Sequence, residues 1–274
     1  MHIAGVSRAI AGLALVAVLV SACSRPTPAP QADEPPARWP ALMSDSTFVW
    51  SAEPGIDLLS GPAVVVRAYL ESKIVASLGG SDDYLYPGFA RAVGPDPGPE
   101  FEPPPGTGAL WPELGFPLTG PRAGSFQEHI LRVVDGDRDV TVTVCDWGWG
   151  TAESKADGGP FRSWPNNPAA PGISVTRFKL VAPVSPGPSL PVQQGPSKFP
   201  VDDVFGNWRV VGSLLSTDDI GAGPEWPEFN QDLATCNALA PESAERRQFL
   251  TTGEHPRSDF PTLPTYPGWP VDSQ

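Results

Sequence analysis

Apolar residues recur at helical spacing between residues 62 and 78, so one stripe of a helix formed there would be hydrophobic. Ser60 and Pro62 are residues typical of a helix start, and the two glycines after Leu78 are typical of a helix end. The pattern therefore predicts an amphipathic helix over residues 62–78. Arg67 and Glu71 lie one turn apart, and we expect them on its solvent side.

The strongest strand pattern lies further along the chain, and its second arm alternates cleanly between two sets of side chains. Residues 126–134 and 138–149 flank an Asp-Gly-Asp turn and indicate a β-hairpin. Three valines of the second arm face one side, whereas Cys145 and Trp147 face the other, and Trp149 continues that second face. Further short elements are predicted along the chain. They are a strand or anchor at 47–50, strands at 173–184 and 207–215, and helices within 82–93 and at 241–250.

These elements predict an α+β domain. Its N-terminal amphipathic helix packs on a curved, cone-like antiparallel sheet of about four to six strands, with long loops rich in proline and glycine. A β-sandwich is the alternative, and the single strong helix before the strands favours the α+β arrangement.

The start of the chain has the pattern of an export signal. Residues 9–20 are an uninterrupted run of small and apolar residues, too short to span a bilayer, and Val20-Ser21-Ala22-Cys23 follows. That ending resembles the lipobox of bacterial lipoproteins. The resemblance implies a signal peptide at 1–22, a lipid such as palmitate on Cys23, and a location on the extracytoplasmic face of the cell membrane.

Composition divides the rest of the chain. Residues 23–40 are proline-rich and predict an extended tether, residues 41–255 a single globular domain, and residues 256–274 a proline-rich C-terminal tail. The chain has 36 prolines and 28 glycines, but its nine tryptophans and twelve phenylalanines favour a folded domain over disorder.

Charge and cysteine content narrow the function further. The net charge of −13 excludes nucleic acid as a partner and leaves membrane attachment to the lipid. Of three cysteines, Cys145 and Cys236 remain once Cys23 is lipidated, and in an exported protein they are expected to form a disulfide.

A helix, a second short helix and then a meander of long strands ending in Trp-Arg-Val-Val is similar to the nuclear-transport-factor-2-like fold. The leader, tether, paired cysteines and tryptophan content also resemble exported lipoproteins common in actinobacteria. The first resemblance implies a pocket at the open end of a cone, in which a strand histidine, His129, acts as a base with Asp146.

Other candidate sites are few. Alternating aspartates at 135–139 lack the closing glutamate of a calcium loop, and no metal site, cofactor or catalytic motif is expected. Trp147, Trp149 and Trp164 are the candidate ligand-binding residues, because exposed rings stack on sugars or hold apolar molecules.

The sequence thus predicts a non-enzymatic, membrane-anchored envelope lipoprotein that binds a small apolar or glycan ligand or a partner protein. Two alternatives stay open. One is a pocket enzyme using His129 with an acidic partner, and the other is a structural accessory subunit of an envelope complex.

Overall fold

The computed structural model describes residues 38–271, except 99, 105–106, 156–157, 164–169, 185–191 and 216–225. The predicted signal peptide, Cys23, most of the tether and Trp164 lie outside the described residues. The end of the tether belongs to the folded part, since Trp39 Nε1 donates to the Met43 carbonyl at 2.8 Å and its ring packs edge-on against Phe48. The domain therefore starts a few residues earlier than expected.

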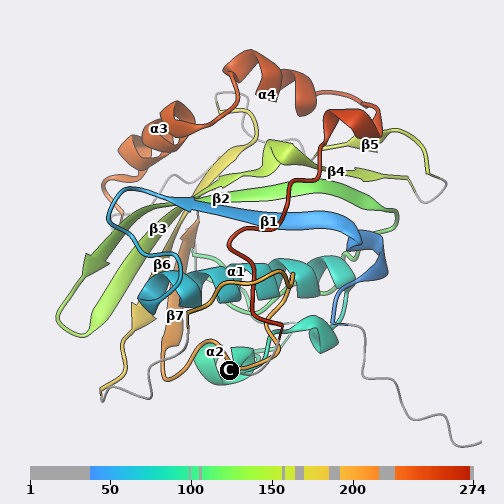
Figure 1. The fold of residues 1–274 in the computed structure, drawn as a ribbon. Helices are drawn as coiled ribbons and strands as arrows, with labels where there is room; N and C mark the ends of the chain where they lie inside the picture. Colours follow the sequence, from blue (N-terminus) through green and yellow to red (C-terminus); the bar gives the residue numbers. More distant parts are fainter. Residues whose placement is uncertain are drawn as a thin grey trace, which may run out of the picture. The chain divides into compact units, whose positions relative to one another are not determined.

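The domain is α+β and is built around one strongly curled sheet (Figure 1). Neighbouring strands run antiparallel, except that β1 pairs with β2 in parallel. A single sheet of this kind rules out the alternative β-sandwich within the described residues. The strands are β1 (Asp45–Ala52), β2 (Arg122–Asp135), β3 (Asp139–Trp147), β4 (Thr151–Ser154), β5 (Phe161–Arg162), β6 (Ile173–Val181) and β7 (Arg209–Leu215).

The predicted hairpin forms as β2 and β3, and β4 continues the pairing along β2. Gln127 pairs with Trp147 and Gly124 with Thr151, so the 3-10 turn η3 (Gly148–Gly150) adds one residue as a bulge would. Gly124 has φ +100°, and a Cβ there would lie 2.0 Å from the Gly150 carbonyl oxygen. Glycine is therefore required where the two backbones approach most closely.

The predicted helix forms as α1 (Gly61–Gly79) and packs on the inner face of the sheet (Figure 1). The expectation that Arg67 and Glu71 face solvent is wrong, because they are 0% and 2% exposed. Helical periodicity places these residues opposite the apolar stripe, but it does not reveal that a second layer of chain covers that side.

That second layer is the C-terminal segment, so the expectation of a separate tail at 256–274 does not describe residues 256–271. Backbone bonds join Trp50 and Phe48 of β1 to Tyr266, which extends the sheet beyond its edge strand. Trp269 is 1% exposed and donates through Nε1 to Glu71 Oε2 at 2.7 Å. The segment thus completes the main core.

Glu71 and Arg67 form a buried polar centre beneath this layer. Glu71 also accepts hydrogen bonds from Trp50 Nε1 and the Tyr86 hydroxyl, and Arg67 lies 4.4 Å from the Trp269 ring. Burial raises the pKa of Glu71 to about 6, although Arg67 and the three donors oppose that shift. The same burial lowers the pKa of Arg67 to about 10.

The opposite face of the sheet carries a second core. Val140, Val142 and Val144 pack in the main core, whereas Cys145 and Trp147 pack in the second, as the alternation predicts. The helices α3 (Phe229–Leu239) and α4 (Ala244–Leu250) cover this face, and α3 was not predicted. The expected disulfide joins Cys145 to Cys236 of α3, with Cα atoms 5.4 Å apart.

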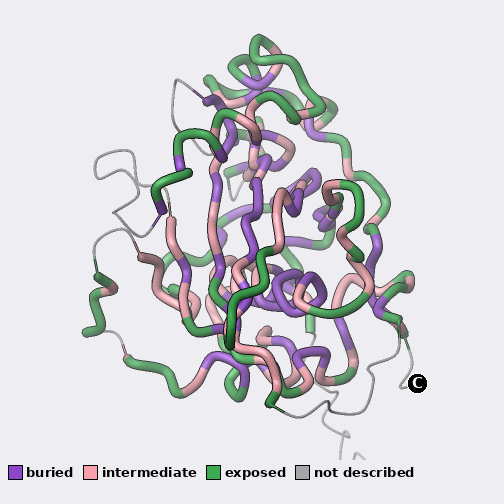
Figure 2. The backbone as a smooth tube through the Cα atoms, turned by 90° about the vertical axis from the view of Figure 1, so that its left-hand side faces the viewer, coloured by how far each residue is buried: buried purple, intermediate pink, exposed green. Residues whose placement is uncertain are grey.

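Figure 2 shows that the buried stretches of the chain gather inside the domain, while loops and helix ends remain exposed. None of the described helices is long and apolar enough to cross a membrane. The short elements are η1 (Ala41–Met43), η2 (Asp82–Tyr84), α2 (Phe89–Val93) and η4 (Arg257–Asp259). The pair η2 and α2 confirms the helices predicted within 82–93, and Pro87-Gly88 lies between them.

Candidate functional site

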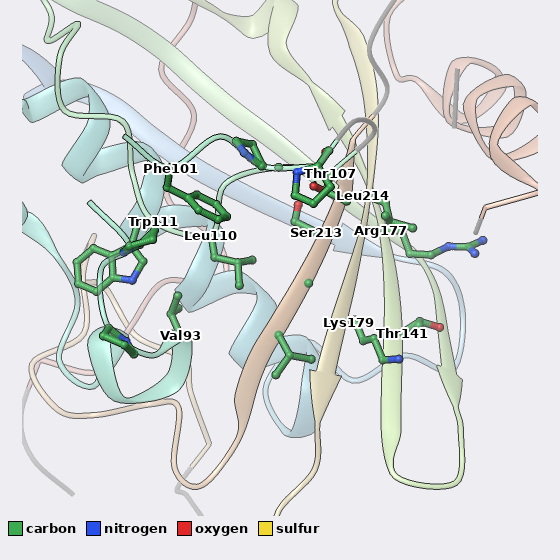
Figure 3. Close-up of a pocket in the computed structure, with 17 residues that line it drawn as sticks. Val93, Phe101, Thr107, Leu110, Trp111, Thr141, Arg177, Lys179, Ser213 and Leu214 are labelled. Atoms are coloured by element: carbon green, nitrogen blue, oxygen red, sulfur yellow. Dashed lines mark hydrogen bonds between the residues drawn. The ribbon is translucent and has the colours of Figure 1, made fainter. Parts of the chain in front are cut away.

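An apolar groove of about 610 Å³ lies between the loop that follows α2 and the strands β6 and β7 (Figure 3). Phe101, Leu110 and Trp111 line it from the loop, and Val211 and Leu214 line it from β7. Its volume is within the range of about 300–1,000 Å³ typical of ligand pockets. Phe101 and Val211 are 47% and 41% exposed, so apolar surface in the groove remains open to solvent.

The loop is held in place by hydrogen bonds to the body of the domain. Gly108 N donates to the Ser213 carbonyl at 2.9 Å, the Tyr69 hydroxyl to the Leu110 carbonyl at 3.0 Å, and Trp111 Nε1 to the Gly94 carbonyl at 3.1 Å. Leu110 and Trp111 also pack against the main core. These two residues therefore anchor the loop to the domain, and the groove is preformed.

Two cationic side chains line the groove, and both already have acidic partners. Lys179 Nζ lies 2.6 Å from Asp139, and Arg177 contacts Glu228 at 3.0 Å and Asp232 at 3.4 Å. Figure 3 shows the Arg177 guanidinium directed away from Phe101 and Trp111. Apolar contact is therefore the main property that the groove offers a ligand.

A second hollow, of about 530 Å³, is polar and lies beside β4 and β5. Lys155 and Arg162 line it and both pair with Glu254, at 3.7 and 3.4 Å. Ser163 also lines it, and its buried hydroxyl has no hydrogen-bond partner among the described residues. The polar lining suits a hydroxylated ligand better than an apolar one.

The predicted tryptophan surface is not a surface where the structure describes it. Trp147 and Trp149 are 6% and 1% exposed and belong to the second core. Trp147 Nε1 donates to the Cys236 carbonyl at 3.2 Å, and the guanidinium of Arg247 lies 5.5 Å from the Trp149 ring. Both rings attach the C-terminal helices to the sheet, so they do not form the exposed binding surface that the sequence predicts.

The predicted pair of His129 and Asp146 does not form. Asp146 alternates with Cys145 and Trp147 along β3 and therefore faces the inner side of the sheet, whereas His129 stacks on Trp147 on the outer side. The acidic neighbour of His129 is Glu53, with Nε2 to Oε1 at 3.1 Å. Residue spacing did not reveal this partner, because β1 reaches β2 through a long-range parallel pairing.

Asp146 lies instead opposite Glu128, across the pairing of β2 and β3. Glu128 is 1% exposed, and neither of its carboxylate oxygens has a hydrogen-bond partner among the residues that the structure describes. Asp146 accepts a hydrogen bond from the Ser174 hydroxyl at 3.0 Å. Desolvation, with Asp146 nearby, raises the pKa of Glu128 well above its usual value. Desolvation likewise raises the pKa of Asp146 to about 6, against the opposing effects of Ser174 and Arg122.

These shifts predict how stability depends on pH. Both carboxyl groups bind protons more tightly in the folded than in the unfolded chain. Their contribution to the free energy of unfolding is therefore complete below the pKa of the unfolded chain. That contribution is lost as pH rises through the pKa values of the folded chain. We expect Glu128→Gln to remove part of this loss and to raise the free energy of unfolding at pH 8 by about 1–3 kcal/mol. Urea unfolding at pH 5 and pH 8 measures the effect.

The control for this variant is Asp135→Asn, which changes an exposed acid at the end of the same strand and should leave the pH dependence as it is in the wild type. A Glu128→Gln protein whose stability falls between pH 5 and pH 8 as steeply as that of the wild type would contradict the prediction.

No group of three or more His, Cys, Asp or Glu side chains that could hold a metal ion gathers in the described part of the chain. The aspartates at 135–139 form the hairpin turn, in which Gly136 N donates to the Asp139 carbonyl at 2.7 Å. Comparison of the chain with protein-family models, with curated proteins and with solved structures finds no match.

Proposed function

We propose that this protein is a lipid-anchored component of the bacterial cell envelope whose domain binds an apolar small molecule in the groove beside β7. The leader and Cys23 support the location, and the disulfide is consistent with an oxidising compartment. The observation that carries the binding function is the preformed groove, whose lining is mainly aromatic, aliphatic and proline side chains.

The curled sheet and the helix inside it also suggest a fold family for the domain. We infer that the domain is cone-like, in the manner of the nuclear-transport-factor-2-like proteins, because α1 packs inside a curled sheet. The parallel strand β1 and the C-terminal segment are additions to that pattern. The groove does not occupy the interior of the curl, which the core residues fill, but lies at the β7 edge.

The groove can be tested with Val211→Glu, a change at an exposed position in its lining. A bound apolar molecule would cover the new carboxylate and remove it from water, which is costly. The variant should therefore bind an apolar fluorescent dye such as 1-anilinonaphthalene-8-sulfonate at least about tenfold more weakly. The measurement is a fluorescence titration of secreted residues 37–274. Native mass spectrometry of the same protein reports any small molecule that it retains.

Val271→Glu is the matched control, because Val271 is 55% exposed and does not line the groove. It should bind the dye as the wild type does. Equal dye affinity of the wild type and Val211→Glu, or an equal loss in both variants, would count against the groove as the binding site.

A further inference from the structure

Three side chains on the outer face of the sheet form a continuous hydrogen-bonded chain. The Ser51 hydroxyl lies 2.8 Å from His129 Nδ1, and His129 Nε2 lies 3.1 Å from Glu53 Oε1. Ser51 is exposed and His129 is 7% exposed, while the Glu53 side chain is 39% exposed. A serine, a histidine and an acid joined in this order can act as a nucleophile, a general base and a group that orients the base.

The acid sets the tautomer that the base needs. Glu53 has no proton to donate when it is ionised, so the ring nitrogen facing it, Nε2, carries the hydrogen. Nδ1 is then the acceptor and receives the hydrogen bond of the Ser51 hydroxyl. A longer contact of 3.4 Å joins that hydroxyl to the Glu128 carbonyl. The imidazole is therefore poised to take a proton from Ser51.

The fold explains why these residues meet. Ser51 pairs with His129 in the parallel ladder of β1 and β2, and Glu53 follows two residues later on the same face. Trp147 stacks on the imidazole with ring centres 5.3 Å apart, and the adjacent disulfide of Cys145 fixes that part of β3. The histidine ring is thus held in one orientation by packing as well as by hydrogen bonds.

A backbone donor stands next to the serine. Glu53 N donates to the Ile130 carbonyl of β2, whereas Trp50 N donates away from β2 to Tyr266, so N–H groups along β1 alternate between its two edges. Ala52 N–H therefore points to the outer edge, where it has no backbone acceptor among the described residues. Such a group, one residue after a nucleophile, can stabilise a developing oxyanion.

We propose that Ser51 and His129, with Glu53 as a positioning residue, form a site that hydrolyses carboxylic esters. Ser51 Oγ attacks the ester carbonyl carbon while its proton passes to His129 Nδ1. The intermediate expels the alcohol, which takes that proton and leaves the acyl group on Ser51. Water then attacks the acyl carbon through the same base, releasing the carboxylic acid and restoring the serine.

This site is separate from the groove, because β1 pairs with β2, whereas β7 pairs with β6, and β3 lies between β2 and β6. It keeps His129 as a base, as the enzyme hypothesis from the sequence had it, but replaces Asp146 by Glu53 and adds the nucleophile. Failure of either site leaves the other unaffected.

The test uses the full chain purified in detergent. A fluorophosphonate should modify Ser51, located by mass spectrometry of peptides, and the protein should hydrolyse p-nitrophenyl acetate. Ser51→Ala and His129→Ala should each lower kcat by at least about 100-fold. Ser44→Ala, which changes another exposed serine outside the chain of hydrogen bonds, should retain the wild-type rate.

Glu53 is tested by its effect on the turnover number. Glu53→Gln should lower kcat and leave KM unchanged, and Glu53→Asp should recover part of the loss, which a merely structural role would not produce. An unmodified Ser51 in the folded wild type, or a Ser51→Ala protein with its disulfide intact that keeps the wild-type rate, overturns the proposal. Labelling of the wild type needs no variant to fold, so the first outcome is decisive by itself.

Discussion

Trp269→Ala should lower the free energy of unfolding by about 3–5 kcal/mol, the loss typical of a large buried aromatic residue. The ring is 1% exposed and packs edge-on against Tyr86. Its removal also leaves Glu71 without one of three donors and exposes the stacked face of Arg67. The residue therefore links a segment near the end of the chain to a charged pair inside the core.

Urea unfolding of the variant at neutral pH measures this loss. Val271→Ala is the control, because Val271 lies two residues further on and is 55% exposed, and its effect should stay within about 0.5 kcal/mol. A loss below about 1 kcal/mol in Trp269→Ala would show that residues 256–271 are not part of the cooperative core.

Removal of the disulfide in the double variant Cys145→Ala, Cys236→Ala should destabilise the domain by about 4–5 kcal/mol in the chain-entropy model. The bridge joins residues 91 positions apart, and both cysteines are 0% exposed. It holds α3 on the outer face of the sheet, where Trp147 Nε1 also bonds to the Cys236 carbonyl. Since a domain is stable by only about 5–15 kcal/mol, the variant should retain little stability.

The reagent control is a reductant. Dithiothreitol should lower the urea midpoint of the wild type, after mass spectrometry has verified complete reduction, and should not move that of the double variant. If full reduction leaves the wild-type midpoint unchanged, the bridge does not restrain the unfolded chain as expected.

Much of the local structure could be predicted from the sequence. The helix α1, the hairpin of β2 and β3, and the two faces of β3 follow from periodicity, because side-chain direction repeats every 3.6 residues in a helix and every two in a strand. The disulfide follows from the cysteine count and from the oxidising compartment that the leader predicts. Each of these inferences depends on neighbouring residues or on composition.

The incorrect expectations share a different origin. Arg67 and Glu71 are polar residues on the side of α1 opposite its apolar stripe. Local periodicity predicts that this side faces solvent, but the C-terminal segment covers it. Trp147 and Trp149 occupy a glycine-rich stretch that suits a binding surface, but α3 and α4 bury them. In both cases a segment distant in the sequence determines which side of a helix or strand is exposed to solvent.

The sequence by itself determined the helix, the hairpin, the pairing of the cysteines and the long loops rich in proline and glycine, since these depend on short-range patterns or on composition. Only the tertiary structure decided which strands pair, and with them the neighbours of His129. The parallel register of β1 and β2 brings Ser51 and Glu53 to that histidine from 78 and 76 residues away. Pairing over such distances is set by the packing of the whole domain, and it leaves no local signal in the chain.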